Sequence, residues 1–208
     1  KAVMGTHGSL THYPLWIKET FGCTTSDRFS MLSGLAHDPL LRDIFTPLQL
    51  GATLCIPSSQ TIATPGQLAR WMNQEKITFT NLTPAMGQLL TTTTEHLKLN
   101  DLRYAFFVGD KLRGENVSAL KKLAPSVKCV NLYGTTETQR SLSYCEVSEG
   151  EVLPVGKGIA GVQLLIMRSV QLAGVSELGE VYVRSRHLAK GYLNDPDLTA
   201  QRFLQNPY

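Results

Sequence analysis

The sequence lacks any apolar run near the roughly 20 residues that a membrane-spanning helix needs, and it lacks Cys-x-x-Cys pairs. Its four cysteines, Cys23, Cys55, Cys129 and Cys145, are far apart, and three of the four lie in or beside apolar stretches. Its five histidines do not have the spacing of zinc ligands. We therefore expect neither a membrane protein nor a zinc site, but buried reduced thiols in a cytoplasmic protein without a signal peptide.

The charge is nearly balanced, with 20 Lys and Arg against 17 Asp and Glu. The basic residues are scattered, so a nucleic-acid partner is not indicated. Hydrophobic residues make up 42% and charged residues 18%, which is typical of a folded globular protein of one or two domains. Because the chain starts at Lys1 and stops at Tyr208 without a closing element, we expect it to be a piece of a longer protein.

Strand-like and helix-like segments alternate between about residues 38 and 133. Two of the helices start at Asp38-Pro39 and Thr64-Pro65, where an N-cap residue precedes the residue preferred at the first helical position. Such alternation predicts βαβ units and a parallel sheet. Helices are expected at 38–50, 64–76, 84–93 and 114–124, and strands at 52–57, 77–82, 103–109 and 127–134.

The pattern changes after about residue 145, where strands expected at 162–167 and 179–185 have no helix between them. These strands predict a small antiparallel sheet, and a short helix is expected within 195–205. The expected fold is therefore α/β. A parallel-sheet βαβ subdomain over 1–145 is followed by a β-rich subdomain over 146–208.

Three polar stretches follow predicted strands of the parallel sheet: "NLTPAMG" (81–87), "VGD" (108–110) and "NLYGTTE" (131–137). In such sheets, ligands bind at the carboxyl ends of the strands. The third stretch has the most groups able to bind a ligand, so the main site is expected there.

Five residues of "NLYGTTE", from Tyr133 to Glu137, are of types that suit a nucleotide site. Gly134 lets the backbone approach a ligand closely, and Thr135 and Thr136 offer hydroxyl and amide donors to phosphate oxygens. Glu137 is a hard oxygen ligand suited to Mg²⁺, and Tyr133 is suited to stacking on a purine. The alternative is a strand-to-helix turn capped by threonines, and the residues alone leave both interpretations open.

A second group of charged residues lies at the start of the helix expected at 38–50. Asp38 and Arg42 are four residues apart, so they share one face of that helix. Placed in a pocket, they would supply one anion and one cation. The alternative is a surface ion pair that adds little stability.

Four stretches, in order along nearly the whole chain, together resemble the adenylate-forming superfamily and its nonribosomal peptide synthetase adenylation domains. "KAVMGTHGSL" (1–10) is similar to the end of the family's phosphate loop, and "HDPLLRDIFTPLQLGATL" (37–54) to the helix that carries its substrate-binding Asp. "NLYGTTET" (131–138) resembles the adenine and Mg²⁺ motif, and "GEVYVRSRHLAKGYLNDPDLTAQRF" (179–203) the family's β-subdomain signature.

A narrower resemblance is to the fungal L-2-aminoadipate reductases, carried by "MLSGLAHDPLLRDIFTPLQLGA", "LTPAMGQLL", "FFVGD" and "YGTTETQR". This resemblance implies ATP-dependent adenylation of the side-chain carboxyl of L-2-aminoadipate in lysine biosynthesis. It also implies transfer to the phosphopantetheine of a carrier domain and reduction with NADPH, by parts of a parent protein outside this chain. The phosphate loop is then incomplete here, and a C-terminal subdomain is missing, so we expect these 208 residues alone to be inactive.

The resemblance also assigns residues. Lys1, Thr135 and Thr136 are implied at the phosphates, Asn131 and Tyr133 at adenine, Gly134 and Gly109 beside the nucleotide, and Glu137 at Mg²⁺. The implied substrate pocket consists of Asp38, Pro39, Arg42, Asn81, Phe106, Val108, Leu132, Arg140 and Ser141. Asn81 stands where a His is expected in these reductases.

The charged positions fit the implied substrate. Its amino-acid end is a zwitterion, and burying it requires one anion and one cation in the pocket. Asp38 supplies the anion, and either Arg42 or Arg140 the cation. Alternatives are a peptide-synthetase adenylation domain for another amino acid, an acyl-CoA ligase, a non-catalytic nucleotide-binding module, and a purely structural α/β domain.

Overall fold

A seven-stranded sheet forms the centre of the computed structural model, which describes residues 1–92, 96–169 and 171–205. The strands lie in the order β2-β1-β3-β4-β5-β6-β7, in which the first five along the chain are parallel and β6 and β7 are antiparallel. The carboxyl ends of β1, β3, β4 and β5 therefore meet at one end of the sheet. Their bounds are β1 Arg28–Ser30, β2 Thr53–Cys55, β3 Phe79–Leu82, β4 Tyr104–Phe107, β5 Lys128–Tyr133, β6 Ser143–Val147 and β7 Lys157–Gly158.

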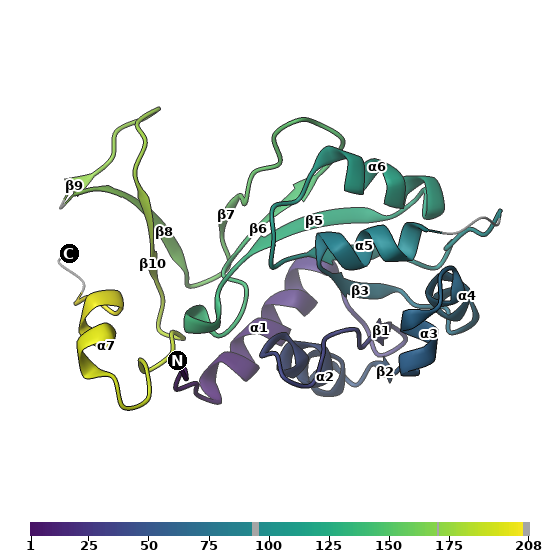
Figure 1. Ribbon diagram of the computed structural model, residues 1–208, viewed down its shortest axis with the longest axis horizontal. Helices are drawn as coiled ribbons and strands as arrows, with labels where there is room; N and C mark the ends of the chain where they lie inside the picture. Colours follow the sequence, from purple (N-terminus) through teal and green to yellow (C-terminus); the bar gives the residue numbers. More distant parts are fainter. Residues whose placement is uncertain (93–95, 170, 206–208) are drawn as a thin grey trace.

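Helices cover both faces of this sheet (Figure 1). Apolar residues of α4, α5 and α6 pack on one face, those of α1 pack on the other, and α2 lies against α1. The bounds are α1 Gly8–Phe21, α2 Pro39–Leu50, α3 Ser59–Ala63, α4 Gln67–Gln74, α5 Pro84–Thr91 and α6 Gly114–Leu123.

Alternation along β4 explains why both faces can be covered. Ala105 and Phe107 belong to the core under α4 to α6, whereas Phe106, between them, belongs to the core under α1. Successive side chains of a strand point to opposite faces, so a strand apolar at every position is buried on both sides. This is the pattern expected of a parallel sheet between two helical layers.

A second sheet lies at one end of the molecule, to the left of the seven-stranded sheet in Figure 1. It is antiparallel, with strands in the order β10-β8-β9, and helix α7 follows it. The bounds are β8 Gln163–Arg168, β9 Gln171–Leu172, β10 Glu180–Arg184 and α7 Pro196–Arg202.

The first residues of the chain run along the segment between β10 and α7. Val3 forms an antiparallel bridge with Tyr192, and the Leu193 N–H donates to the Ala2 carbonyl at 2.9 Å. This pairing places Lys1 beside Tyr192, 191 positions away in the sequence.

The predicted fold class and the parallel order of the central strands are confirmed, as is the antiparallel pairing of the later strands. Helices α1 and α3 and strands β1, β6, β7 and β9 were not predicted from the sequence, and helix α4 begins at Gln67 and not at Thr64, which is the C-cap residue of α3. Strands β6 and β7 extend the large sheet to Gly158. The subdomain boundary between residues 145 and 146 stays a prediction.

Asp38 does not cap α2 as the Asp-Pro pattern predicted. It occupies the N-cap position, but its backbone is helical (φ −58°, ψ −27°) and its side chain makes no capping hydrogen bond. The carboxylate instead accepts a hydrogen bond from the Thr136 hydroxyl at 3.0 Å. Asp38 is therefore directed toward the loop after β5.

Two expectations from composition can also be compared with the structure. Cys23, Cys55 and Cys129 are buried and free, and Cys145 is half-buried and free. Within the described ranges, none of the helices is long and apolar enough to cross a membrane.

Candidate active site

Glu137 is the centre of a polar cluster just beyond the end of β5. It lies in a short 3₁₀ turn, η1 (Thr136–Thr138), whose start is fixed by hydrogen bonds between Thr135 and Thr138. The Tyr192 hydroxyl donates to Glu137 Oε1 at 2.7 Å, and Lys1 Nζ donates to the same oxygen at 3.1 Å. The pairing of residues 2–4 with 190–193 thus brings both donors to one carboxylate.

The donors keep Glu137 ionised. The hydrogen bond from Tyr192, reinforced by Lys1, lowers the pKa of Glu137 from 4.5 to about 2 against the opposing effect of burial. The hydrogen bond between Lys1 and Glu137 in turn raises the pKa of Lys1. A carboxylate that is always charged near neutral pH is suited to hold a divalent cation.

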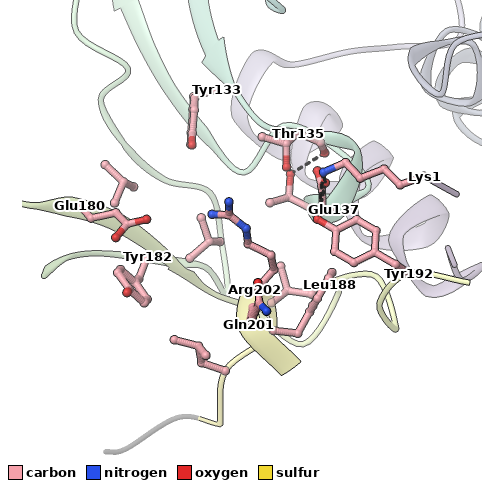
Figure 2. A pocket seen from close by; sticks show the side chains of 15 residues that line it. Lys1, Tyr133, Thr135, Glu137, Glu180, Tyr182, Leu188, Tyr192, Gln201 and Arg202 are labelled. Carbon is pink, nitrogen blue, oxygen red and sulfur yellow. Dashed lines mark hydrogen bonds and ion pairs between the residues drawn. The ribbon is translucent and has the colours of Figure 1, made fainter. Parts of the chain in front are cut away.

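A cavity of about 430 Å³ opens beside this cluster. Figure 2 shows Lys1, Glu137 and Tyr192 together on one side of it, with Glu180 and Tyr182 of β10 across from them. Tyr133, Thr135 and Arg202 also line it. We call it the Glu137 cavity.

A second cavity, of about 550 Å³, lies at the carboxyl ends of β3, β4 and β5, and we call it the Arg42 cavity. It brings together most of the residues predicted from the sequence. Lining it are Asp38, Pro39, Arg42, Asn81, Val108, Gly109, Gly134, Thr135, Thr136, Arg140 and Ser141. Thr135 lines both cavities, so the two adjoin at the loop after β5.

Two predicted substrate-binding residues lie elsewhere. Phe106 is 1% exposed and Leu132 is 3% exposed, and both belong to the core under α1, lining neither cavity. The side-chain amide of Asn131, predicted at adenine, donates to the carbonyls of Leu153 and Pro154. It therefore fixes the segment before β7, and its adenine role stays a prediction.

Arg42 is buried and does not pair with Asp38 as a surface ion pair. Its guanidinium donates from Nε and Nη2 to Asp43 Oδ1 at 3.1 and 3.0 Å. Arg42 and Asp43 are only 5% and 1% exposed. The sequence offered a surface ion pair of Asp38 and Arg42 as the alternative. The structure instead shows a buried pair of Arg42 and Asp43.

Arg140 is a second buried cation, and its guanidinium donates to the Gln139 carbonyl. Within residues 1–92, 96–169 and 171–205 it makes no ion pair. Burial lowers the pKa of Arg140; the charge of Asp38 acts against this and that of Arg42 adds to it. Arg140 is therefore a desolvated charge that an added anion would stabilise.

The threonines of "NLYGTTE" do take part in a turn, as the alternative interpretation proposed. The Thr135 N–H donates to the Thr138 hydroxyl at 2.9 Å, so that amide is engaged in the turn. Thr135 still lines both cavities, and Thr136 contacts Asp38. The same residues close the turn and line the site.

Asp43, Tyr192 and Tyr13 were not predicted from the sequence. Asp43 was hidden by its position next to Arg42, whereas Tyr192 lies inside the signature stretch 179–203 and was detectable there. Tyr13 of α1 is fully buried, which raises the pKa of its hydroxyl to about 12, and that hydroxyl has no hydrogen-bond partner among the described residues. No pattern in the sequence indicated its place.

The described residues contain no group of three or more His, Cys, Asp or Glu side chains that could hold a metal ion by themselves. Glu137 offers one carboxylate. Mg²⁺ beside a nucleotide commonly takes one or two carboxylates and completes its shell with phosphate oxygens and water. Glu137 therefore fits a magnesium ion that arrives with a nucleotide.

Comparison with known proteins identifies the family. The sequence model of the family described as "AMP-binding enzyme" matches residues 1–193. The chain belongs to the AMP-binding enzyme family. The Glu137 and Arg42 cavities are both built from residues inside the matched range, apart from the α7 side of the first.

Curated proteins similar to this chain include L-2-aminoadipate reductases. That of Schizosaccharomyces pombe is 47% identical over 220 residues, covering 99% of this chain and 15% of the relative. That of Saccharomyces cerevisiae is 47% identical over 222 residues, covering 99% and 16%. Surfactin synthase subunit 2 of Bacillus subtilis is 30% identical, covering 100% and 6%. The chain thus spans 15–16% of the length of the two reductases.

Solved structures agree with this membership. The crystal structure of a variant of the nonribosomal peptide synthetase FmoA3 matches with a TM-score of 0.91 and 31% identity, covering 99% of this chain and 23% of that one. A form of the same protein with AMPPNP bound matches with a TM-score of 0.90, at the same identity and coverage. The α/β fold of this member of the AMP-binding enzyme family is therefore that of a peptide-synthetase structure.

Proposed function

We propose that this chain is part of an adenylation domain that activates the side-chain carboxyl of L-2-aminoadipate with ATP. The observation that carries the proposal is the meeting of the two cavities at Thr135. One cavity has Lys1 and Glu137, whose pKa is lowered to about 2, and the other has two buried arginines with Asp38. An acid bound in the second lies next to a nucleotide bound in the first.

The Glu137 cavity is the proposed nucleotide side. Glu137 is the residue that would hold Mg²⁺, which neutralises phosphate charge when bound. Lys1 pairs with that carboxylate and is proposed to contact phosphate oxygens. Tyr133 lines the same cavity and is proposed to face the adenine.

The chemistry needs no nucleophile from the protein. A carboxylate oxygen of the acid attacks the α-phosphorus, the bond to the pyrophosphate breaks, and an acyl adenylate and pyrophosphate form. The protein places the two reactants together and stabilises the charge that develops on the phosphates. Thr135 and Thr136 lie where the two reactants meet, and Gly134 keeps the loop free of a side chain there.

The Arg42 cavity is the proposed acid side. The amino-acid end of 2-aminoadipate carries an ammonium and a carboxylate, and both must be balanced when buried. Asp38 supplies the anion for the ammonium, and an arginine of the cavity supplies the cation. An acid with a purely apolar tail leaves these charges unpaired, which gives the site a basis for rejecting it.

The wider activity follows from the similarity to the reductases. In a longer protein, the acyl group passes to the phosphopantetheine of a carrier domain and is reduced with NADPH to the semialdehyde, as a step of lysine biosynthesis. We place this activity in the cytoplasm. The chain itself is proposed to bind only ATP, Mg²⁺ and the acid.

Two other enzymes are the main alternatives. A peptide-synthetase adenylation domain for another amino acid is favoured by the 31% identity to FmoA3. An acyl-CoA ligase has no need for two buried arginines beside Asp38. A non-catalytic nucleotide-binding module is the third alternative and predicts no turnover.

The experiment is ATP–pyrophosphate exchange by the full-length protein with 2-aminoadipate, glutamate, leucine and hexanoate. We expect exchange with 2-aminoadipate far above the other three. Exchange with leucine or hexanoate at the same rate keeps the adenylation and removes the charged-pocket assignment. No exchange with any acid removes the enzymatic proposal.

A further inference from the structure

Asp43 accepts several hydrogen bonds behind the wall of the Arg42 cavity, where it contacts two of the lining residues, Arg42 and Asn81. Its Oδ1 accepts from Arg42 Nε and Nη2 and from the Asn81 amide at 3.1 Å. Its Oδ2 accepts from the backbone N–H groups of Leu32 and Ser33, at 3.4 and 3.1 Å. One buried carboxylate therefore ties α2 to the segment after β1 and to β3.

Because of these contacts, the positive charge of Arg42 is already neutralised by the Asp43 carboxylate. The side chain of Asp43 is 0% exposed and that of Arg42 is 6% exposed, so their charges offset each other where water does not screen them. A second carboxylate brought to Arg42 meets a cation that is already neutralised and lies close to the Asp43 anion. Arg42 is a poor partner for the substrate carboxylate.

The positive charge of Arg140, by contrast, is not neutralised by an ion pair within the described ranges. Arg140 is 8% exposed and lines the same cavity, but no carboxylate pairs with it within the described ranges. The half-buried Asp38 is the anion that favours its charged form, and the Asp38 carboxylate already accepts from Thr136. Arg140 can bind a carboxylate in bidentate fashion without displacing an existing pair.

Asp43 also fixes how Asn81 is presented. A carboxylate only accepts hydrogen bonds, so the Asn81 amide nitrogen must face Asp43. The Asn81 carbonyl oxygen has no partner among the described residues and is available to accept a hydrogen bond in the cavity. An ammonium group is a suitable donor for it.

We propose that Asp43 is a positioning residue that holds Arg42 and Asn81 as an electrically neutral wall of the Arg42 cavity, so that Arg140 binds the substrate's α-carboxylate. This inference rests on the proposed function. In this proposal, Arg140 discriminates between acids with and without an α-carboxylate. Arg42 and Asp43 determine the shape of the wall.

Two substrates isolate the α-carboxylate in an exchange assay. Removing it from 2-aminoadipate gives 5-aminopentanoate, which keeps the reacting carboxyl, the chain and the ammonium. The ratio of kcat/KM for the two acids reports the carboxylate contact alone. A change that merely loosens the fold lowers both rates and leaves the ratio unchanged.

The variants are made in the full-length protein. Arg140→Gln is expected to lower the ratio by about 100-fold, the upper range for one charge-assisted hydrogen bond. The double variant Arg42→Gln with Asp43→Asn keeps a neutral hydrogen-bonded pair and is expected to hold the ratio within about threefold of wild type. If that double variant does not fold, Arg42→Met with Asp43→Leu replaces the pair by apolar groups, with the same expectation.

A matched control is the buried carboxylate Asp27 with its partner Arg103, which directly precede strands β1 and β4. Asp27 is also buried, at 2% exposure, and accepts from Arg103 Nη1 at 2.7 Å and from the Thr24 N–H at 2.8 Å. It precedes β1, at the opposite end of the parallel strands from the cavity. Asp27→Asn with Arg103→Gln should lower stability without changing the ratio.

The outcomes separate the two levels of proposal. A ratio that falls in the Arg42 and Asp43 double variant as far as in Arg140→Gln, with the control unchanged, overturns the inference and makes Arg42 the carboxylate partner. An unchanged ratio in Arg140→Gln also overturns it. Absence of exchange by the wild-type protein with 2-aminoadipate instead removes the proposed function.

Discussion

At the residue scale, the contact between Tyr192 and Glu137 gives a prediction about pH. Tyr192→Phe removes the largest cause of the low pKa of Glu137, so that pKa should rise from about 2 toward its ordinary value near 4.5. Because the folded pKa is depressed, Glu137 stabilises the wild-type fold above its unfolded pKa, and this contribution is lost as pH falls toward 2. In Tyr192→Phe the folded and unfolded pKa values of Glu137 lie closer together, so the variant should lose less stability from this carboxylate over the same pH range.

Carboxylate NMR titration of Glu137 between pH 6 and 2, in the wild type and in Tyr192→Phe, measures this directly. The substitution keeps an aromatic ring beside Phe203, which the Tyr192 ring contacts at 5.7 Å between centroids, so packing is little changed. An identical titration in both proteins would show that Tyr192 does not hold the carboxylate.

The pair of Arg42 and Asp43 gives a second prediction. Arg42→Leu leaves the Asp43 carboxylate buried without its cation, which costs about 3–5 kcal/mol of stability for a broken buried pair. Activation of 2-aminoadipate should fall about 100-fold as the wall distorts. Adding Asp43→Leu should restore much of both, measured by chemical denaturation and pyrophosphate exchange. Lack of any restoration would mean that Arg42 acts on the substrate itself.

The sequence predicted Asp38, Arg42 and Arg140 for one pocket, and all three line the same cavity. It did not reveal Asp43, because side chains of adjacent helical residues point in directions about 100° apart and are not expected to meet. The long Arg42 side chain folds back onto its neighbour, and no spacing rule predicts that. Phe106 was assigned to the pocket by its match to a pocket position of the family, and in the structure its side chain lies in the core under α1.

At the element scale, the loop after β5 depends on a residue without a side chain. A Cβ on Gly134 would lie 2.6 Å from the Arg140 carbonyl oxygen and 2.7 Å from Ser141 Cα, both backbone atoms. Gly134→Ala should therefore destabilise the fold by about 1–3 kcal/mol, as overpacking does. It should also weaken pyrophosphate exchange.

Gly150→Ala is the control for that change, since a Cβ there meets nothing within 4 Å. Chemical denaturation of both variants decides the prediction, with Gly150→Ala expected to stay within about 0.5 kcal/mol of wild type. Equal stability of the two variants would show that the loop can shift without cost.

Elements with a clear period or a boundary residue were predictable, even the three-residue strand β2, whose predicted stretch ends at Pro57, whereas short elements without such a boundary were not. Helices α2, α5 and α6 and strands β3 to β5 lie within the ranges predicted for them. Strand β1 has three residues, too few for a period to appear, and α1 contains Pro14 and begins in the stretch taken for a phosphate loop. Asp38 could act as a cap by type, but the Thr136 hydroxyl, 98 positions away, binds its side chain instead.

At the scale of the whole molecule, residues 1–208 alone should show little or no pyrophosphate exchange. The chain covers 15% of the S. pombe reductase, and the resemblance implies that further parts of the phosphate loop and a C-terminal subdomain complete the site. The full-length protein, assayed beside it at equal concentration, is the positive control. Exchange by the 208 residues at a comparable rate would show that they contain the complete catalytic apparatus.

The arrangement of the whole site depends on contacts between distant segments. Tyr192 reaches Glu137 only because residues 2–4 pair with residues 190–193 and the Ala189 N–H donates to the Glu137 carbonyl at 2.9 Å. Local patterns contain no information on such pairing, so the sequence indicated the two motifs but not their meeting. The family resemblance predicted that the two motifs occur in this order along the chain. Only the structure shows that Tyr192 of one contacts Glu137 of the other.

The most direct test of the account follows oxygen from the acid to the nucleotide. The full-length protein is given ATP and 2-aminoadipate labelled with ¹⁸O in its carboxyl groups, and hydroxylamine traps the activated acid. We expect one ¹⁸O in AMP, none in pyrophosphate, and a hydroxamate at the side-chain carboxyl. Label in inorganic phosphate, or a hydroxamate at the α-carboxyl, would contradict it.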